Sequence, residues 1–291
     1  MVKKVLLASP RGYCAGVERA IDTVEKALGL YGPPVYVRKQ IVHNLHVVRE
    51  LEERGAVFVE DENEVPEGET IVFSAHGIAP SVRANAAERR LGTIDATCPL
   101  VTKVHVQAKR YAAAGYTIIL IGHAGHEEVV GTIGEAPEAT ILVESVADVE
   151  ALSLGPDAKL AYLTQTTLSV DETGEIITAL RRRYPTIYAP KKEDICYATS
   201  NRQWAVKEMI AEIDLLLVVG SRNSSNSNRL VEVVGLTSGA SAPEKLVERV
   251  CDWFRARGVT EIEPYRLVDE DVEFRLPIEL RRELALAESQ P

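Results

Sequence analysis

The feature that most constrains the fold is a strand–turn–helix pattern that returns along nearly the whole chain, from residue 4 to residue 258. Short apolar runs such as KVLLAS, TIVFSA and TIILIG each end in a polar or glycine-rich signature, and an amphipathic stretch follows each of them. Strands that alternate with helices indicate βαβ units and parallel sheets. The sequence therefore predicts an α/β protein built from several such units.

The polar signatures fall where a parallel sheet would bind a ligand. In such sheets ligands bind at the carboxyl ends of strands and at the N-termini of the helices that follow. The chain places at these positions Cys14, His43, His76, Cys98, residues 123–128, residues 165–167, Cys196, residues 221–227 and residues 238–241.

Composition excludes several classes of protein. The 291-residue chain has a net charge of −10, which argues against nucleic-acid partners and an anionic membrane surface. Its apolar runs are too short for a membrane span, and the VLLA run near the N-terminus is too short for a signal peptide. We expect a cytoplasmic protein, and its four cysteines then do not form a disulfide framework.

Three of the four cysteines lie at predicted helix starts. Cys98 precedes a proline, which favours the first helical position, so Cys98 should lie at the N-cap, where the helix dipole favours a thiolate. Cys14 lies in RGYCAG, and Cys196 precedes a helix whose N-cap we expect at Thr199 or Ser200. Cys251 instead falls on an apolar helical stripe and should be buried core.

The spacing of Cys14, Cys98 and Cys196 suggests three similar modules that each offer one cysteine. Three thiolates that converge could hold a [4Fe–4S] cluster and leave one iron open to a substrate oxygen. A zinc site with three cysteines and a histidine is the competing interpretation. No C-x-x-C pair is present, which excludes zinc ribbons and thioredoxin motifs.

Histidines and hydroxyl-rich loops indicate a phosphorylated ligand. His43, His76 and His126 occupy equivalent turns after strands, and GSRNSSNSN and TSGASAP can offer N–H and O–H groups to phosphate oxygens. Neither loop matches a nucleotide P-loop. Glu127 and Glu128 follow His126, and a carboxyl shielded from water there could donate a proton. The residues alone do not choose between the two glutamates.

Several motifs together resemble the IspH/LytB family of 4-hydroxy-3-methylbut-2-enyl diphosphate reductases. The resemblance rests on PRGYCAGVERAI, IVHNLHVV, FSAHGIAPSV, DATCPLVTKVH, IGHAGHEEVVGTIGE, YLTQTTLSVDET, ICYATSNRQ, GSRNSSNSNRL and TSGASAPE. These motifs run from residue 10 to residue 244 and cover nearly the whole chain.

The resemblance implies a trefoil of three α/β modules around a central [4Fe–4S] cluster, one per subunit, with one iron left open. Its ligands would be Cys14, Cys98 and Cys196. Glu128 would be the proton donor, and Thr166 would lie near the substrate's hydroxyl carbon. The residues that would hold the diphosphate are His43, His76, His126, Ser224, Ser225, Asn226 and Ser241.

The implied reaction is a two-electron reductive dehydration that yields isopentenyl and dimethylallyl diphosphates, the last step of the non-mevalonate isoprenoid pathway. Ferredoxin or flavodoxin would supply the electrons. Two other functions remain open from the residues: a cluster-dependent hydro-lyase, which needs no external electrons, and a non-enzymatic iron–sulfur sensor. A phosphosugar isomerase or binding protein could use the serine loops but would leave the cysteines without a role.

We predict module boundaries at residues 1–97, 98–193 and 194–265, followed by a C-terminal tail over 266–291. The third module departs from the family pattern, because only 15 residues separate Asn226 from Ser241. We therefore predict that the stretch between residues 228 and 236 is shortened against the family, and this puts the placement of Ser241 in question.

Overall fold

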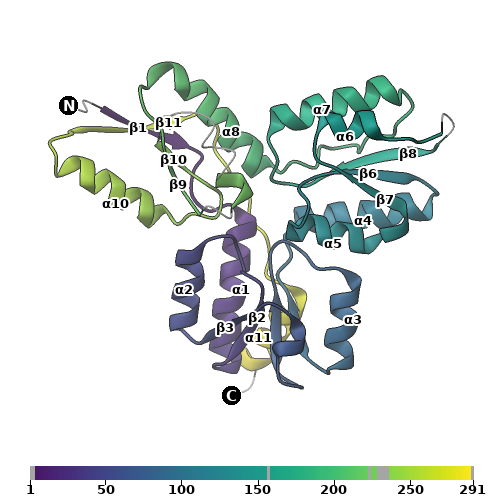
Figure 1. Cartoon of the computed structure of the whole chain (residues 1–291). Coiled ribbons are helices and arrows are strands. Elements are labelled where there is room, and N and C mark those ends of the chain that lie inside the picture. Colours follow the sequence, from purple (N-terminus) through teal and green to yellow (C-terminus); the bar gives the residue numbers. More distant parts are fainter. Residues whose placement is uncertain (1–3, 156–157, 222–223, 228–235, 290–291) are drawn as a thin grey trace.

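The computed structural model describes residues 4–155, 158–221, 224–227 and 236–289. They form three lobes around a common centre, as in a trefoil (Figure 1). Each lobe holds one sheet, and every strand pairing given within the three sheets is parallel. The predicted α/β class, the parallel sheets and the trefoil arrangement are confirmed.

The first lobe has the strand order β3-β2-β4-β5. Its strands are β2 (Val35–Arg38), β3 (Ala56–Val59), β4 (Thr70–Phe73) and β5 (Gly92–Asp95). Its helices are α1 (Ala15–Tyr31), α2 (Leu45–Glu53), α3 (Pro80–Glu88) and the short 3₁₀ helix η1 (Glu62–Glu64). The apolar stripe of α1, including Ala20 and Val24, packs in the same core as Val35 and Val37 of β2.

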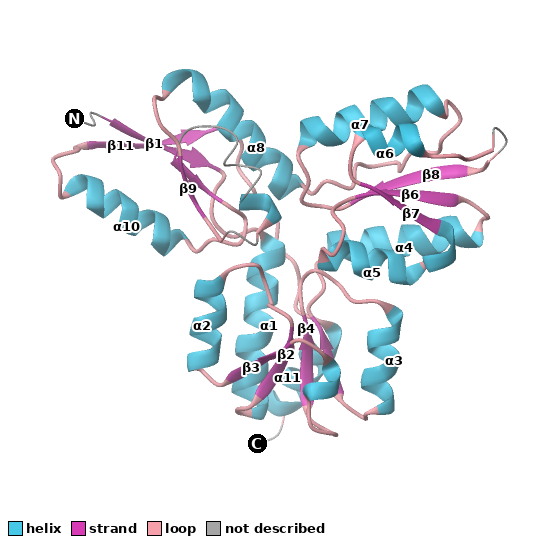
Figure 2. Cartoon of the chain, viewed as in Figure 1, coloured by secondary structure: helices cyan, strands magenta, loops and turns pink. Residues whose placement is uncertain are grey.

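The second lobe has the strand order β7-β6-β8, with β6 (Thr117–Ile121), β7 (Thr140–Val143) and β8 (Leu160–Thr164). Helices α4 (Pro99–Ala113) and α5 (Glu127–Glu135) cover one face, and α6 (Val146–Ala151) and α7 (Val170–Arg183) cover the other (Figure 2). The 3₁₀ helix η2 (Pro137–Ala139) precedes β7. Two apolar cores therefore sandwich this sheet.

The third lobe combines the N-terminal strand with segments from the last third of the chain. Its strand order is β11-β1-β10-β9, with β1 (Lys4–Ser9), β9 (Leu217–Val219), β10 (Leu236–Ser238) and β11 (Glu261–Arg266). Its helices are α8 (Tyr197–Met209), η3 (Ile210–Glu212) and α10 (Glu244–Arg255). Cys251 lies on the apolar side of α10 and is 3% exposed, as its helical spacing predicted.

The grouping of the strands differs from the predicted boundaries at both ends of the chain. Residues 4–9 were assigned to the first module, but β1 pairs with β11 and β10 of the third lobe. Residues 266–291 were expected to be a tail, but α11 (Ile278–Glu288) buries Leu280 in the core of the first lobe. Both differences arise from pairings between segments far apart in the sequence, which a local pattern does not encode.

Strands β3, β7 and β11 also went unrecognised in the sequence pattern. The stretch SNRLVEVV over residues 227–234, which the repeating strand–helix pattern predicts as a short helix, lies outside the described residues apart from Ser227. No helix of the described part of the chain is long and apolar enough to cross a membrane.

Candidate active site

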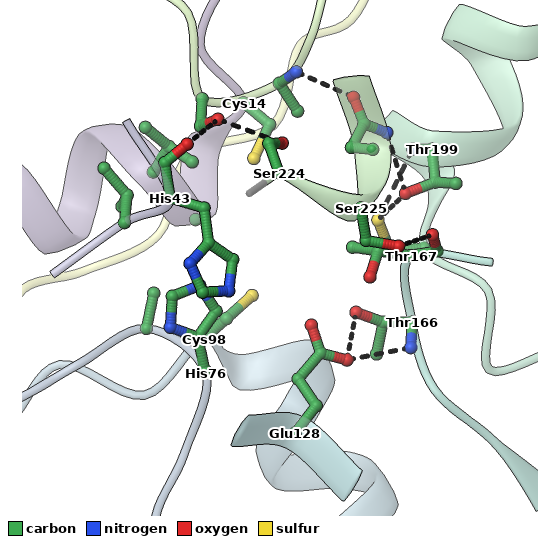
Figure 3. Close-up of a pocket in the computed structure, with 18 of the residues that line it drawn as sticks. Cys14, His43, His76, Cys98, Glu128, Thr166, Thr167, Thr199, Ser224 and Ser225 are labelled. Carbon is green, nitrogen blue, oxygen red and sulfur yellow. Dashed lines mark hydrogen bonds between the residues drawn. The ribbon is translucent and has the colours of Figure 1, made fainter. Parts of the chain in front are cut away.

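A cavity at the centre of the trefoil is lined by all twelve predicted site residues. They come from all three lobes, and Figure 3 shows several of them around a shared space. They are Cys14, Cys98, Cys196, His43, His76, His126, Glu128, Thr166, Ser224, Ser225, Asn226 and Ser241. The fold thus brings together side chains that are up to 227 positions apart in the sequence (Cys14 to Ser241).

Each of the three cysteines is the N-cap of a helix and the point where the chain passes to another lobe. Cys14 follows β1 of the third lobe and caps α1 of the first, and Cys98 follows β5 of the first lobe and caps α4 of the second. Cys196 leaves the second lobe and caps α8 of the third. The N-cap expected at Thr199 or Ser200 is therefore Cys196 itself, whose sulfur accepts a hydrogen bond from the Thr199 N–H at 3.4 Å.

The thiols are not activated as their helix positions had suggested. Burial raises the pKa of the Cys98 thiol to about 12 and that of Cys196 to about 11, and it also raises the pKa of Cys14. Backbone N–H groups at the helix starts lower each pKa, but the loss of hydration outweighs them. The helix dipole alone therefore does not produce a thiolate at these cysteines.

The space in front of the sulfurs depends on Gly16. A Cβ atom built on Gly16 would lie 2.9 Å from Sγ of Cys98 and 3.8 Å from Sγ of Cys14. Any side chain at this position in the first turn of α1 would thus occupy the space between two thiols. No three His, Cys, Asp or Glu side chains of the described residues are grouped as the ligands of a single metal ion would be.

The three histidines pack against one another at one side of the cavity. The rings of His43 and His76 stack with centroids 3.8 Å apart, and His126 meets their edges at 5.4 and 6.1 Å. Burial lowers the pKa of His43 and of His126 to about 4, and it lowers the pKa of His76 well below its usual value. All three rings are therefore neutral at pH 7.

The tautomer of His126 follows from its role as the N-cap of α5. Its Nδ1 accepts a hydrogen bond from the Glu128 N–H at 3.2 Å, so the ring proton of the neutral form is on Nε2. That Nε2 is buried and has no hydrogen-bond partner among the described residues, and the same is true of Nε2 of His43. Such atoms are costly unless a ligand bonds to them.

The two adjacent glutamates have different surroundings. Oε2 of Glu128 accepts hydrogen bonds from the N–H and the hydroxyl of Thr166, both at 2.9 Å, inside the cavity (Figure 3). Burial raises the pKa of the Glu128 carboxyl, although these two hydrogen bonds oppose the rise. Glu127 instead lies near Arg38 and Lys39, at 3.7 and 3.8 Å. The geometry therefore favours Glu128 over Glu127 as a group that acts in the cavity.

Hydrogen bonds hold the hydroxyl and amide side chains of the third-lobe loops in place around the cavity. Oγ of Ser241 donates to the His43 carbonyl at 3.2 Å and lies 3.4 Å from Oγ of Ser224. Asn226 donates to Thr199 and accepts the Ala240 N–H at 2.8 Å. Ser225 is turned to the carbonyl of Thr167. Ser241, whose placement the spacing put in question, thus lies in the cavity beside Ser224.

Comparison with known proteins gives the family. Residues 5–234 match the model of the family described as LytB protein. The chain is 57% identical over 310 residues to a 4-hydroxy-3-methylbut-2-enyl diphosphate reductase of Acidothermus cellulolyticus, which covers 97% of this chain and 91% of that relative. The chain belongs to the LytB family.

Two solved structures support the same relationship. A reductase from Plasmodium falciparum superposes with a TM-score of 0.96 at 39% identity, covering 99% of this chain and all of that one. A second reductase, described as the terminal enzyme of the non-mevalonate pathway, has a TM-score of 0.66 at 28% identity and covers 88% of this chain and all of that one.

The alignment also bears on the length of this LytB family member. The alignment with the Acidothermus reductase spans 310 positions, which is more than the 291 residues of this chain. The relative therefore has residues that this chain lacks. The match to the family ends at residue 234. The shortening that we predict between residues 228 and 236 lies outside the described residues apart from Leu236, where β10 begins.

Sequence reasoning missed some residues that shape this LytB site. Thr199 was expected only as a helix cap, but its hydroxyl lies 3.1 Å from the Cys196 sulfur and accepts a hydrogen bond from Asn226. Asn44 caps α2 and also donates to the Ser241 carbonyl at 2.8 Å, which links the first and third lobes. Gly16 had a visible signal, because RGYCAG places it two residues after a cysteine.

Proposed function

We propose that the chain is a 4-hydroxy-3-methylbut-2-enyl diphosphate reductase that carries out the last step of the non-mevalonate isoprenoid pathway. The allylic alcohol would take up two electrons and two protons, lose its hydroxyl as water, and give isopentenyl and dimethylallyl diphosphates. The observation that carries this proposal is the single cavity that combines three cysteines, three neutral histidines and the buried Glu128–Thr166 pair. The names of the relatives support it.

We further propose that Cys14, Cys98 and Cys196 hold one [4Fe–4S] cluster, with the fourth iron open. The donor set fits this group, because three buried thiols from three lobes line one cavity and Gly16 leaves the space in front of two of them empty. When bound, the cluster would supply the electrons and a Lewis-acid iron for the substrate oxygen. The helix N-termini behind the cysteines would favour the thiolates that a metal requires.

The diphosphate would bind between the histidines and the third-lobe loops. Neutral His126 offers an Nε2–H that has no partner within the described part of the chain. The Nε2 of His43 is likewise without a partner there and can take the same tautomer. Ser224, Asn226 and Ser241 come from the facing loops, and His76 and Ser225 complete the set. Buried neutral donors hold an anion by hydrogen bonds, so no positive charge need be desolvated in the cavity.

Glu128 would deliver the proton to the departing oxygen. Its Oε2 already accepts two hydrogen bonds from Thr166, so the proton of the neutral carboxyl belongs on Oε1. A raised pKa keeps more of this carboxyl protonated near neutral pH, as a general acid requires. The Thr166 hydroxyl bonds to the Glu128 carboxyl inside the cavity. It would orient this carboxyl and would lie next to the substrate carbon that carries the hydroxyl.

Anaerobic reconstitution tests this proposal. Purified protein would be treated with iron and sulfide, analysed for both elements, and mixed with 4-hydroxy-3-methylbut-2-enyl diphosphate. We expect about four irons per chain, and turnover only when a reductant such as reduced ferredoxin, reduced flavodoxin or dithionite is present. Water loss without a reductant would indicate a hydro-lyase instead. A bound cluster with no turnover under either condition would favour a sensor.

A further inference from the structure

Each of the three helices that follow a cysteine carries a cationic side chain in its second turn. Arg19, Lys103 and Arg202 lie five, five and six residues after Cys14, Cys98 and Cys196, in the second turn of α1, α4 and α8. Each of these side chains reaches the backbone that precedes another cysteine. The same relationship therefore occurs three times around the centre of the trefoil.

In the first lobe, Arg19 connects the helix that begins after Cys14 to the segment that precedes Cys98. Its guanidinium donates to the carbonyls of Ala96 and Thr97 at 2.8 and 3.0 Å, and to Asp95 at 3.3 Å. The side chain is buried, and its Nε donates to the carbonyl of Arg275. A buried guanidinium is costly unless its N–H groups are bonded, and here the backbone bonds them.

In the second lobe, Lys103 connects the helix that begins after Cys98 to the segment that precedes Cys196. Its Nζ donates to the carbonyls of Lys192 and Glu193 at 3.0 and 2.9 Å, and to the Asp194 carboxylate at 2.9 Å. Asp194 is buried and its other oxygen accepts the Thr164 N–H at the end of β8. This single ammonium therefore fixes three consecutive residues just ahead of Cys196.

In the third lobe, Arg202 connects the helix that begins after Cys196 to the segment that precedes Cys14. Its guanidinium donates to the carbonyl of Gly12 at 3.1 Å and lies 3.5 Å from that of Tyr13. Both oxygens of Glu270 lie 3.1 Å from the same side chain, which is fully buried. Arg202 thereby links Cys196 to Cys14, so that each of the three pairs of cysteines is connected by one cationic side chain.

We propose that Arg19, Lys103 and Arg202 form a ring of three struts that sets the separation of each pair of cysteines, and so positions the ligands of the cluster. Each strut joins the start of one cysteine's helix to the backbone that precedes another cysteine. The struts therefore hold the three cysteines at fixed positions relative to one another, although no thiol bonds to another. The three positive charges also lie behind a site that would hold an anionic group, which makes its reduction easier. These are positioning residues, and the proposal rests on the proposed function for the identity of the group they serve.

Lys103 is the best strut to test, because its side chain is 30% exposed and its loss opens no buried cavity. Lys103→Met keeps the stem but removes the charge and the donors, and Lys103→Arg restores both. Lys207→Met is the matched control: Lys207 lies on α8, is 36% exposed and crosses to Asp171 of α7, but its ion pair involves no segment ahead of a cysteine. Lys103→Gln, which keeps a neutral donor, serves if the methionine variant does not fold.

The first measurement is hydrogen exchange in the metal-free protein over residues 190–196. We expect exchange about tenfold faster or more in Lys103→Met, since one charge-assisted hydrogen bond corresponds to roughly that factor. Lys207→Met should match the unsubstituted protein there, and Lys103→Arg should largely restore protection. Unchanged exchange in both Lys103→Met and Lys103→Gln would overturn the strut.

The second measurement is made on the reconstituted protein. Lys103→Met should lose iron to a chelator about tenfold faster and have a more negative midpoint potential, whereas Lys207→Met should change neither. Release and potential equal to the control would overturn the link between the strut and the cluster. If the unsubstituted protein takes up no cluster, the proposed function fails, while the exchange measurement on metal-free protein still decides whether the strut exists.

Discussion

Oε2 of Glu128 accepts both the backbone N–H and the hydroxyl of Thr166, each at 2.9 Å, in a position that is shielded from solvent. These residues lie on different segments of the second lobe: Glu128 is in the first turn of α5, and Thr166 follows β8. Their pairing holds the carboxyl in one orientation inside the cavity and leaves Oε1 to carry the proton. Glu127, one residue earlier, is held outward by Arg38 and Lys39.

Replacing Glu128 by glutamine should remove the proton donor while keeping the side chain's shape. We expect Glu128→Gln to retain the cluster and substrate binding but to lower kcat by about 10²–10⁴-fold, the usual contribution of general acid catalysis. Glu127→Gln is the control and should change kcat by less than about threefold, because its carboxylate makes only partly exposed ion pairs. Steady-state kinetics with a chemical reductant would measure both. A Glu128→Gln loss below tenfold would assign the proton to another group.

The four cysteines should respond unequally to substitution by serine. Cys14→Ser, Cys98→Ser and Cys196→Ser should each lose or destabilise the iron–sulfur chromophore, because each removes one thiolate ligand. Cys251→Ser should keep full iron content. It should lose only about 1–3 kcal/mol of stability, because it buries a hydroxyl in the apolar core against which α10 packs. Iron and sulfide analysis after anaerobic reconstitution measures this. Equal iron content in all four variants would contradict the ligand assignment.

The buried histidines predict that the metal-free protein loses stability as the pH falls. His43 and His126 have a pKa of about 4 in the folded chain, below the 6.5 of an exposed histidine. Between these values the unfolded chain binds the proton that the folded chain rejects, so lowering the pH from 7 to 5 favours unfolding. Each histidine should contribute about 2 kcal/mol to this loss.

Urea unfolding of the metal-free protein at pH 7 and pH 5 would measure that loss. The comparison variant is His126→Asn, because asparagine can cap α5 in place of the imidazole and does not titrate. The difference in unfolding free energy between pH 7 and pH 5 should be smaller in this variant by about 2 kcal/mol. The comparison cancels the contributions of other carboxyl and histidine groups. An identical pH dependence in the two proteins would show that His126 is not buried as a neutral ring.

Local sequence signals predicted the position of the cysteines well. The Cys98–Pro99 pair marked the start of α4, and the apolar run before each signature marked a strand that ends at the cavity. The twelve site residues predicted near those strand ends line one cavity, because parallel strands of three sheets point their carboxyl ends to a common centre. The set of candidate residues was therefore readable from the chain.

The contacts between segments far apart in the sequence could not be predicted from local patterns. The pairing of β1 with β11 joins residues 4–9 to 261–266, and no local pattern specifies such a register. The raised pKa of the Cys98 thiol depends on burial by other lobes, whereas its helix position alone pointed the other way. The links made by Arg19, Lys103 and Arg202 likewise join residues that lie 77, 90 and 190 positions apart in the sequence.

The last prediction concerns Gly16, which shares α1 with Gly29. Neither glycine has a positive φ angle. Gly16→Ala would place a methyl group 2.9 Å from Sγ of Cys98, in the space between two thiols. Gly29→Ala would meet no atom of the described residues within 4 Å. In an isolated helix both changes would favour folding by up to about 1 kcal/mol.

We therefore expect the two alanine variants to separate stability from cluster uptake. Gly29→Ala should be as stable as the unsubstituted protein or more so, and should take up iron and sulfide normally. Gly16→Ala should fold, because the flexible Cys98 thiol can rotate away from the methyl group, but its cluster should be incomplete or lost readily to a chelator. Thermal unfolding of the metal-free proteins and iron content after reconstitution measure the two properties. Full iron content in Gly16→Ala, with normal resistance to the chelator, would mean that the cluster does not occupy the space in front of Cys14 and Cys98.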